Sequence, residues 1–366
     1  MKRILLVFGT RPEAIKMCPL VNELRLRSDV FDARVCVTGQ HREMLQSVLD
    51  VFCVVPDYDL AVMQDGQSLF DITSKVLLGM KGVLADFRPD IVLVHGDTTT
   101  SFAAALASFY EHILVGHVEA GLRTHNLQSP WPEEFNRQSV DIISDYLFAP
   151  TEKARKNLLS EGKDTRSIWV TGNTGIDALA HTVGKSFEHP ELDWAKGSKL
   201  VLITAHRREN LGDPMHSMFR AIRRVLDERD DVRAIYPIHM NPQVREAAAS
   251  ELKGCDRIHI IEPLDVVSFH NFMDQSYLIL TDSGGIQEEA PSLGKPVLVM
   301  RDTTERPEGI KAGTLKLVGT EEDRIYQAFS LLLEDADEYE AMSQASNPYG
   351  DGFASMRIAN ILEEEL

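Results

Sequence analysis

Long hydrophobic runs are missing from this sequence of 366 residues. No window approaches the roughly 20 apolar residues that a membrane-spanning helix requires, so we expect no membrane partner. The apolar run that follows residues 1–3 covers only positions 4–8, which is too short for the core of a secretory signal peptide. Both absences lead us to expect a cytoplasmic protein.

Cysteine is scarce as well. Cys18, Cys36, Cys53 and Cys255 are widely spaced and form no Cys-x-x-Cys pair. This spacing argues against a disulfide framework, and it is typical of reduced thiols in the core of a cytosolic protein.

Positive charge is in short supply. The chain carries 38 Lys and Arg residues against 56 Asp and Glu residues, which gives a formal net charge of −18. Such a protein has no general means of neutralising the phosphates of nucleic acid or of an anionic membrane, so we expect neither as a partner. An anionic ligand must then be held by a few local cations.

The common cofactor motifs are also missing. No Gly-x-Gly-x-x-Gly follows a predicted strand, and there is neither a Walker A motif nor a His-Glu-x-x-His motif. The conceivable metal-ligand pairs are His95 with Asp97, His117 with Glu119, and His206 with His239. None of these pairs belongs to a zinc motif, and we expect neither a metal nor a cofactor.

What the sequence does contain is a regular alternation of short apolar runs and helical patterns. The predicted strands are residues 4–8, 33–37, 91–94, 113–115, 146–148, 168–170, 199–203, 234–238, 258–261, 278–280, 297–300 and 315–318. The pattern restarts at residue 199, after a predicted linker over residues 193–198. It predicts an α/β fold of two doubly wound parallel-sheet, Rossmann-like domains that face each other across a cleft.

We place the N-terminal domain at residues 1–170 and the C-terminal domain at residues 171–349. A helix over residues 350–366 is expected to pack back on the first domain. The expected ligand site is the cleft between domains, beyond the carboxyl ends of the strands.

The most informative stretch covers residues 277–299. A buried strand ends in Asp282, Ser283, Gly284 and Gly285, and a helix is predicted from Gly285 to residue 294. A serine and two glycines at a helix start leave backbone N–H groups open to an anion such as a diphosphate. A tight turn with an N-cap gives the same pattern, so the rest of the chain has to decide.

Polar side chains collect directly after the predicted strands, where parallel strands converge. They are Arg11, Asp97, Glu119, His206, His239, Ser283 and Arg301. The cations suited to a diphosphate are Arg11, Lys16, Arg207 and Arg306. For each cation the alternative is a solvated or salt-bridged side chain.

Three carboxylates, Asp97, Glu119 and Glu133, can divide acid and base roles between them. The alternative for Asp97 is an Asx turn. The alternative for Glu133, which follows Pro132, is a partner of the helix dipole. Glu119 has the weakest structural alternative, because it lies in a predicted loop between two apolar stretches.

Seven segments, in order, resemble those of the non-hydrolysing UDP-N-acetylglucosamine 2-epimerases. They are FGTRPEAIKM at 8–17, HGDT at 95–98, HVEAGLR at 117–123, PEE at 132–134 with Asn136 and Arg137, HRRE at 206–209, TDSGGIQEEA at 281–290, and RDTTERPE at 301–308. The likeness runs from about residue 4 to residue 352. Two positions depart from the family pattern: Ala205 stands where the family often has glycine, and Leu264 where a polar residue on the uridine side is expected.

The resemblance implies a GT-B-like fold, a homodimer, and a cytoplasmic role in making UDP-N-acetylmannosamine for surface polysaccharides, without metal or nicotinamide. It assigns catalysis to Asp97, Glu119, Glu133 and His206. It assigns binding of the UDP-sugar to Arg11, Lys16, His206, Phe269, Ser283, Gly284, Gly285, Glu289 and Arg306, with Glu289 on the ribose hydroxyls. A possible allosteric substrate site matches Gln40, Glu43, Arg207 and His239.

The implied reaction removes the proton from C2 while UDP leaves C1, which gives a 2-acetamidoglucal intermediate. UDP then adds back, and C2 is protonated on the opposite face. Three other functions stay open: a hydrolysing relative that releases N-acetylmannosamine, a UDP-sugar glycosyltransferase on the same fold, and a catalytically silent nucleotide-sugar sensor. The glycosyltransferase leaves Asp97 and Glu133 unexplained, and the sensor has no use for the three carboxylates.

Overall fold

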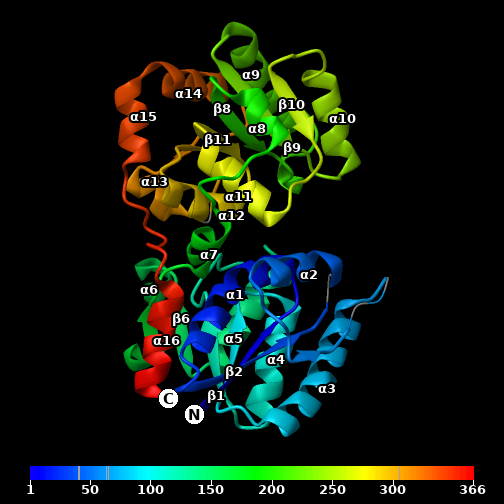
Figure 1. Ribbon diagram of the computed structural model, residues 1–366, viewed down its shortest axis with the longest axis vertical. Coiled ribbons are helices and arrows are strands. Elements are labelled where there is room, and N and C mark those ends of the chain that lie inside the picture. The colour runs from blue at the N-terminus through cyan, green and yellow to red at the C-terminus, as the bar shows by residue number, and fades with distance from the viewer. Residues whose placement is uncertain (40–41, 63, 65, 305) are drawn as a thin grey trace. The chain divides into compact units, whose positions relative to one another are not determined.

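The protein, as a computed structural model, is described over residues 1–39, 42–62, 64, 66–304 and 306–366. It consists of two compact units, Met1–His181 with Tyr349–Leu366 (unit 1) and Thr182–Pro348 (unit 2) (Figure 1). Each unit is an α/β domain built on one parallel sheet, and this confirms the predicted fold class.

Unit 1 contains a seven-stranded sheet in the order β3-β2-β1-β4-β5-β6-β7. The strands are β1 (Lys2–Phe8), β2 (Phe31–Val37), β3 (Tyr58–Asp59), β4 (Ile91–His95), β5 (Leu114–Val118), β6 (Tyr146–Ala149) and β7 (Ile168–Val170). The chain builds outward from β1 to β3 and then returns to the other side of β1 with β4. At such a switch point, ligands bind beyond the carboxyl ends of the strands.

The helices of unit 1 cover this sheet. They are α1 (Arg11–Leu26), α2 (Arg42–Val51), α3 (Leu69–Phe87), α4 (Thr99–Tyr110), α5 (Glu133–Ile143), α6 (Glu152–Ser160), α7 (Thr174–Thr182) and α16 (Ala354–Glu365), with a short 3-10 turn at Thr165–Ser167. The last helix, α16, packs on α1, and Lys2 Nζ donates to the Leu362 carbonyl at 3.0 Å, so both termini lie together (Figure 1).

The division between the units differs from the predicted boundary at residue 170. Helix α7 stays with unit 1 because Asp177 accepts hydrogen bonds from the backbone N–H groups of Ala354 and Ser355, at the start of α16. The compact units therefore separate at His181 and Thr182.

Unit 2 repeats the plan with a six-stranded sheet in the order β10-β9-β8-β11-β12-β13, whose switch point lies between β8 and β11. The strands are β8 (Lys199–Thr204), β9 (Val232–Pro237), β10 (Ile258–Ile261), β11 (Leu278–Thr281), β12 (Val297–Val299) and β13 (Leu315–Leu317). The helices are α8 (Pro190–Ala195), α9 (Asp213–Glu228), α10 (Pro242–Glu251), α11 (Val266–Gln275), α12 (Gly284–Glu289), α13 (Pro307–Ala312), α14 (Glu322–Glu334) and α15 (Ala336–Ser343). Two short 3-10 turns complete it, η2 (Arg208–Asn210) and η3 (Ala290–Leu293).

Strand residues explain why both sheets lie inside. Ile4 to Phe8 in β1 and Leu278 to Leu280 in β11 are fully buried, as expected for parallel strands covered on both faces. Helices instead bury one side. In α9 the buried residues are Met215, Met218, Phe219, Ala221, Ile222, Val225 and Leu226, which recur at helical spacing.

Several element boundaries differ from the prediction. Strand β5 continues to Val118, so His117 lies inside the sheet and not in the following loop. The helix expected over residues 285–294 is split into α12 and η3, because Pro291 has no N–H for the α-helical ladder. Residues 193–195 of the expected linker belong to α8. Among the four free cysteines, Cys53 is exposed and not in the core.

Candidate functional site

The carboxyl edge of the unit 1 sheet carries the predicted carboxylates. Asp97 follows β4, Glu119 follows β5, and Glu133 begins α5. Arg11 begins α1, immediately beyond β1. These residues therefore surround the switch point at which a ligand of a doubly wound sheet is expected.

Glu119 is held by two basic side chains. Its carboxylate forms an ion pair with Lys16, and Oε2 lies 3.6 Å from His95 Nε2. Burial alone would raise the pKa of Glu119, but Lys16 and His95 outweigh it and hold that pKa well below its usual range. The carboxylate is therefore ionised at neutral pH and is available as a proton acceptor.

The backbone of Glu119 is also unusual. Its φ of +70° lies in the left-handed region, which a non-glycine residue enters at a cost of about 1–3 kcal/mol. Such a conformation persists only where the surrounding structure enforces it. It turns the chain sharply at the end of β5 and sends the Glu119 side chain to Lys16.

Asp97 is oriented by helix α5. Its carboxylate pairs with Arg137, and its backbone carbonyl accepts a hydrogen bond from Asn136 Nδ2 at 2.9 Å. Glu133 lies in the first turn of the same helix and is half-buried. No hydrogen bond or ion pair joins Glu133 to another described side chain, so it differs from the paired carboxylates Asp97 and Glu119.

Sequence reasoning missed Glu13, a buried residue of α1 that lies beneath the turns after β1 and β4 and bonds to both. Its side chain is buried and accepts hydrogen bonds from the backbone N–H groups of Gly9 and Thr10, and from the hydroxyls of Thr98 and Ser101. Glu13 thereby ties the turn after β1 to the turn after β4. The signal was present as a capping box, Thr-x-x-Glu, at the start of α1.

His117 belongs to a buried network. Nδ1 lies 2.6 Å from Asp141 Oδ1, and Nε2 lies 2.8 Å from the Gly96 carbonyl oxygen. Arg123 reaches Asp141 at 2.7 Å and Glu161 at 2.7 Å. Burial would raise the pKa of Asp141, but His117 and Arg123 overcome it and lower that pKa. With both ring nitrogens engaged, His117 is no partner for Glu119 in a metal pair.

The carboxyl edge of the unit 2 sheet carries the expected anion-binding turn. Ser283 stands before α12 and makes no side-chain capping bond, while its N–H donates to Thr281 Oγ1 at 2.9 Å. The N–H of Ser283 is therefore engaged, contrary to the expectation from sequence, and the open N–H groups of the turn are those of Gly284 and Gly285.

Arg306 lies directly on this turn. A Cβ added at Gly284 would fall 2.6 Å from Arg306 Nη1, so a larger residue there would push the guanidinium away from the backbone. Arg306 is oriented by an ion pair with Glu288. Together these residues place a cation beside the N-terminus of α12, which favours a bound anion.

Asp282 organises the other side of the turn. It is fully buried, and Oδ2 accepts the backbone N–H groups of His206 and Arg207 at 2.9 Å and the Asn210 amide at 3.1 Å. His206 Nδ1 lies 3.3 Å from Asp282 Oδ1, and the His206 ring stacks on His239. Burial, together with His239 and Arg207, lowers the pKa of His206 despite Asp282. The imidazole is therefore neutral at pH 7.

The remaining predicted residues of unit 2 lie nearby in the fold. Glu289 ends α12, and its Oε2 is 3.7 Å from His270 Nε2 on α11; half-buried Phe269 precedes His270. Arg207 and His239 follow β8 and β9. Of the other two residues of the possible allosteric site, Gln40 lies outside the described residues, and Glu43 is described only as part of α2.

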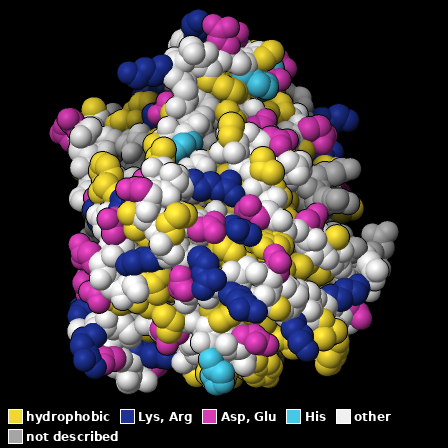
Figure 2. Space-filling view, turned by 60° about the horizontal axis from the view of Figure 1, so that its bottom comes forward, with side chains coloured by type: hydrophobic (Ala, Val, Ile, Leu, Met, Phe, Trp, Pro, Cys, Tyr) yellow, Lys and Arg dark blue, Asp and Glu magenta, His cyan; other side chains and the backbone are white. Residues whose placement is uncertain are grey.

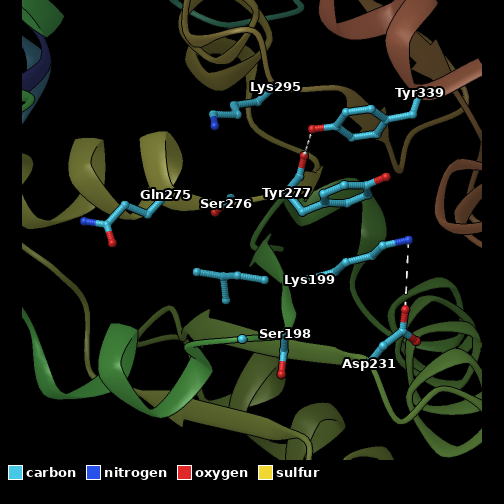
Figure 3. A pocket seen from close by; sticks show the side chains of 10 residues that line it. Ser198, Lys199, Asp231, Gln275, Ser276, Tyr277, Lys295 and Tyr339 are labelled. Atoms are coloured by element: carbon cyan, nitrogen blue, oxygen red, sulfur yellow. Dashed lines mark hydrogen bonds and ion pairs between the residues drawn. The ribbon is translucent and has the colours of Figure 1, made fainter. Parts of the chain in front are cut away.

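A separate pocket of about 590 Å³ opens at the amino edge of the unit 2 sheet (Figure 3). Lys199 donates to a backbone carbonyl of α14 at 2.7 Å, and Tyr339 donates to the Tyr277 carbonyl at 2.9 Å while their rings stack. These polar groups are already bonded within the protein. The pocket also lies at the opposite strand ends from His206 and Ser283, so it is not the candidate site.

Surface charge is mixed on the face shown in Figure 2. On the face shown in Figure 2, Lys and Arg side chains are interspersed with Asp and Glu side chains, and neither sign forms a continuous field. Among the described residues, none of the helices combines the length and the apolar character needed to cross a membrane. The same part of the chain holds no group of three or more His, Cys, Asp or Glu residues arranged to bind a metal.

Comparison with known proteins decides the family. The model of the UDP-N-acetylglucosamine 2-epimerase family matches residues 23–363. The chain belongs to this family. It is 60% identical, over 360 residues, to the UDP-N-acetylglucosamine 2-epimerase of Bacillus subtilis (strain 168), with 98% of this chain and 94% of the relative covered.

Two solved structures resemble this epimerase-family chain. The S. aureus MnaA–UDP co-structure has a TM-score of 0.91 at 55% identity, with 100% of this chain and 96% of the other covered. The Neisseria meningitidis UDP-GlcNAc 2-epimerase bound to UDP-GlcNAc has a TM-score of 0.91 at 48% identity, with 99% and 100% covered. The resemblance drawn from the seven sequence segments is thereby confirmed, as is the assignment to a family of isomerases.

Within this epimerase family member, the predicted site residues form a group in each unit. The carboxyl edge of unit 1 carries Arg11, Lys16, Asp97, Glu119 and Glu133, and that of unit 2 carries Arg207, His206, His239, Phe269, Ser283, Gly284, Gly285, Glu289 and Arg306. Three buried carboxylates beside them, Glu13, Asp141 and Asp282, were missed. Asp141 and Asp282 bond to groups distant along the chain, which a sequence does not display, whereas Glu13 carried the local signal of a capping box.

Proposed function

We propose that this protein reversibly epimerises C2 of UDP-N-acetylglucosamine to give UDP-N-acetylmannosamine. The observation that carries the proposal is the set of three carboxylates, Asp97, Glu119 and Glu133, at the switch point of unit 1. Inversion at C2 needs one group that removes a proton and another that returns one to the opposite face. Members of the same family bind UDP-GlcNAc and UDP, which supports this substrate.

We infer that the reaction is an elimination followed by an addition. A carboxylate takes the C2 proton, the C1–O bond breaks, and UDP leaves to give 2-acetamidoglucal. UDP then re-adds at C1 while an acid on the opposite face of the sugar protonates C2. Glu119, ionised through Lys16 and His95, suits the base, and unpaired Glu133 suits the acid in one direction. Asp97, paired with Arg137, suits an electrostatic role or a relay.

Unit 2 is assigned to the departing UDP. The N–H groups of Gly284 and Gly285 and the guanidinium of Arg306 would stabilise the diphosphate as charge develops on it. Glu289 would accept hydrogen bonds from the ribose hydroxyls, and Phe269 would lie against the base. Arg11 and neutral His206 would complete the contacts to the phosphates and the sugar.

The experiment uses purified protein, UDP-N-acetylglucosamine and D₂O, with a chelator and without added nucleotide cofactor, followed by NMR. We expect deuterium at C2 together with UDP-N-acetylmannosamine. Free N-acetylmannosamine with UDP would identify a hydrolysing enzyme instead. If the substrate remains unchanged and without deuterium, the epimerase proposal fails, and a transferase or a sensor takes its place.

Three wider roles rest on the same family resemblance. We propose a cytoplasmic homodimer, whose apolar contact would come from exposed residues on the neighbouring helices α3, α4 and α5, namely Phe70, Leu78, Phe109, Tyr110, Phe135 and Ile142. A monomer at micromolar concentration in sedimentation velocity would contradict the proposed homodimer.

We propose that the product feeds surface polysaccharide synthesis. Activation by substrate through Arg207 and His239 would appear as sigmoidal kinetics that become hyperbolic in His239→Ala.

A further inference from the structure

Helix α5 presents a row of functional side chains on one face. Glu133, Arg137 and Asp141 follow each other at i, i+4 and i+8, the spacing that places residues above one another on a helix. Glu133 is itself a candidate acid, and Arg137 pairs with Asp97. Asp141 is the member whose carboxylate is buried, and it bonds to groups next to Glu119 and not to Glu119 itself.

Asp141 holds the segment around Glu119 from both sides. Oδ1 accepts from His117, two residues before Glu119, and Oδ2 accepts from the Gly121 N–H at 3.2 Å, two residues after it. The residue between these anchors is the one with left-handed φ. One carboxylate therefore bridges the strained turn, and it adds to the hydrogen bonds from the Glu119 and Ala120 N–H groups to the Phe148 carbonyl that also hold this conformation.

His117 extends this clamp to the turn that carries Asp97. Its Nε2 bonds the Gly96 carbonyl, and the Gly96 N–H donates to the Val118 carbonyl at 2.9 Å. Both the N–H and the carbonyl of Gly96, whose φ is +61°, are therefore hydrogen-bonded to residues of β5. His95 and Asp97 are the neighbours of Gly96 in the chain, so these two hydrogen bonds fix the backbone from which both side chains extend.

The partners of His117 determine which of its ring nitrogens donate hydrogen bonds. A carbonyl oxygen and an ionised carboxylate can only accept hydrogen bonds, so the two contacts of His117 require a donor at each ring nitrogen. Arg123 bonds to buried Asp141 and to exposed Glu161, so a row of alternating charge runs from the interior to the surface. Neutralising one buried member leaves the charge of its partner uncompensated, which is destabilising.

We propose that Asp141 and His117 are positioning residues of the epimerase, which hold the backbone of Glu119 and Gly96 so that Glu119 and Asp97 keep their reactive geometry. Neither side chain touches substrate in this scheme. The proposal rests on the proposed function, because it concerns the carboxylates of the same reaction, and it adds to that function the device that aligns them.

The test compares Asp141→Asn, His117→Ala and His117→Gln with the wild type in the deuterium assay. We expect Asp141→Asn and His117→Ala to lower kcat about 10²-fold, the scale of a misplacement near 1 Å, with little change in KM or in UDP affinity. His117→Gln keeps a donor where Nε2 stood, so it should recover part of the loss.

A matched control is Asp145→Asn. Asp145 accepts the Val115 N–H at 2.9 Å at the other end of β5, so the same chemical change is made on the same strand away from the site. Its kcat should equal that of the wild type. Wild-type kcat in folded Asp141→Asn, or equal loss in Asp145→Asn, would overturn the proposal.

A second measurement does not depend on activity. In ¹⁵N-labelled protein, His117 should show two slowly exchanging ring N–H protons, both absent from His117→Gln. A single ring proton would refute the clamp even if Asp141→Asn fails to fold. An inactive wild type with both ring protons present would remove the proposed function and leave the clamp as a structural feature, so the two failures are distinguishable.

Discussion

Replacing Glu119 by glutamine is the sharpest perturbation of the proposed reaction. The substitution keeps the size of the side chain but removes the charge that pairs with Lys16. It also replaces the carboxylate, the only group of residue 119 basic enough to take a proton from C2, by a non-basic amide. The φ of +70° is no harder for glutamine than for glutamate, so the backbone should be preserved.

Two effects of Glu119→Gln have to be compared, the loss of turnover and the loss of folding stability. Loss of a general base lowers turnover about 10²–10⁴-fold, or roughly 2.7–5.4 kcal/mol of transition-state stabilisation. Loss of the ion pair should cost less than about 3 kcal/mol of folding stability, the lower limit for a fully buried pair, because Lys16 and Glu119 retain 15% and 14% exposure. Turnover is therefore compared per folded molecule, so that a loss of stability is not counted as a loss of catalysis.

The assay is incorporation of deuterium at C2, measured beside urea unfolding and UDP binding. We expect turnover to collapse while UDP affinity is kept. Glu338→Gln, which breaks the Lys316 pair in unit 2, is the control and should leave turnover unchanged. Near-full activity in folded Glu119→Gln would remove Glu119 from the mechanism.

Three further outcomes follow from unit 2 and from the buried network. Gly284→Ala places a Cβ 2.6 Å from Arg306 Nη1, so the guanidinium has to move away from the turn. Calorimetry should then show UDP binding about tenfold weaker, or roughly 1.4 kcal/mol, and unchanged affinity would contradict the role of Arg306. His206 should titrate in NMR below the usual value of about 6.5, and Asp282→Asn should lower its pKa further, because Asp282 opposes the effect of burial; a rise would refute this. The folded pKa of Asp141 is lowered, so its stabilisation is present above the unfolded pKa near 3.9 and is lost as pH falls through the folded value. The gap in unfolding free energy between wild type and Asp141→Asn should therefore narrow in acid, and a constant gap in urea melts would disprove the assignment.

The prediction from sequence succeeded where the signal is local. Buried parallel strands are continuous apolar runs, so β1, β4, β8 and β11 were located to within a few residues. It failed where tertiary contacts override the local pattern. His117 ended in β5 because its ring fits a buried site between Asp141 and Gly96, and α7 joined unit 1 because Asp177 caps α16.

The sequence by itself determined the fold class, the family and the chemical type of each site residue, because these follow from periodicity and from motifs that lie together along the chain. Only the tertiary structure decided which groups are paired. Asp141 lies far along the chain from Gly96, yet His117 joins them, and the ionisation of Glu119, in the turn after β5, depends on Lys16 from helix α1. Hydrogen bonds and charge interactions act over a few ångströms of space, so they become defined only when the sheet brings distant residues together.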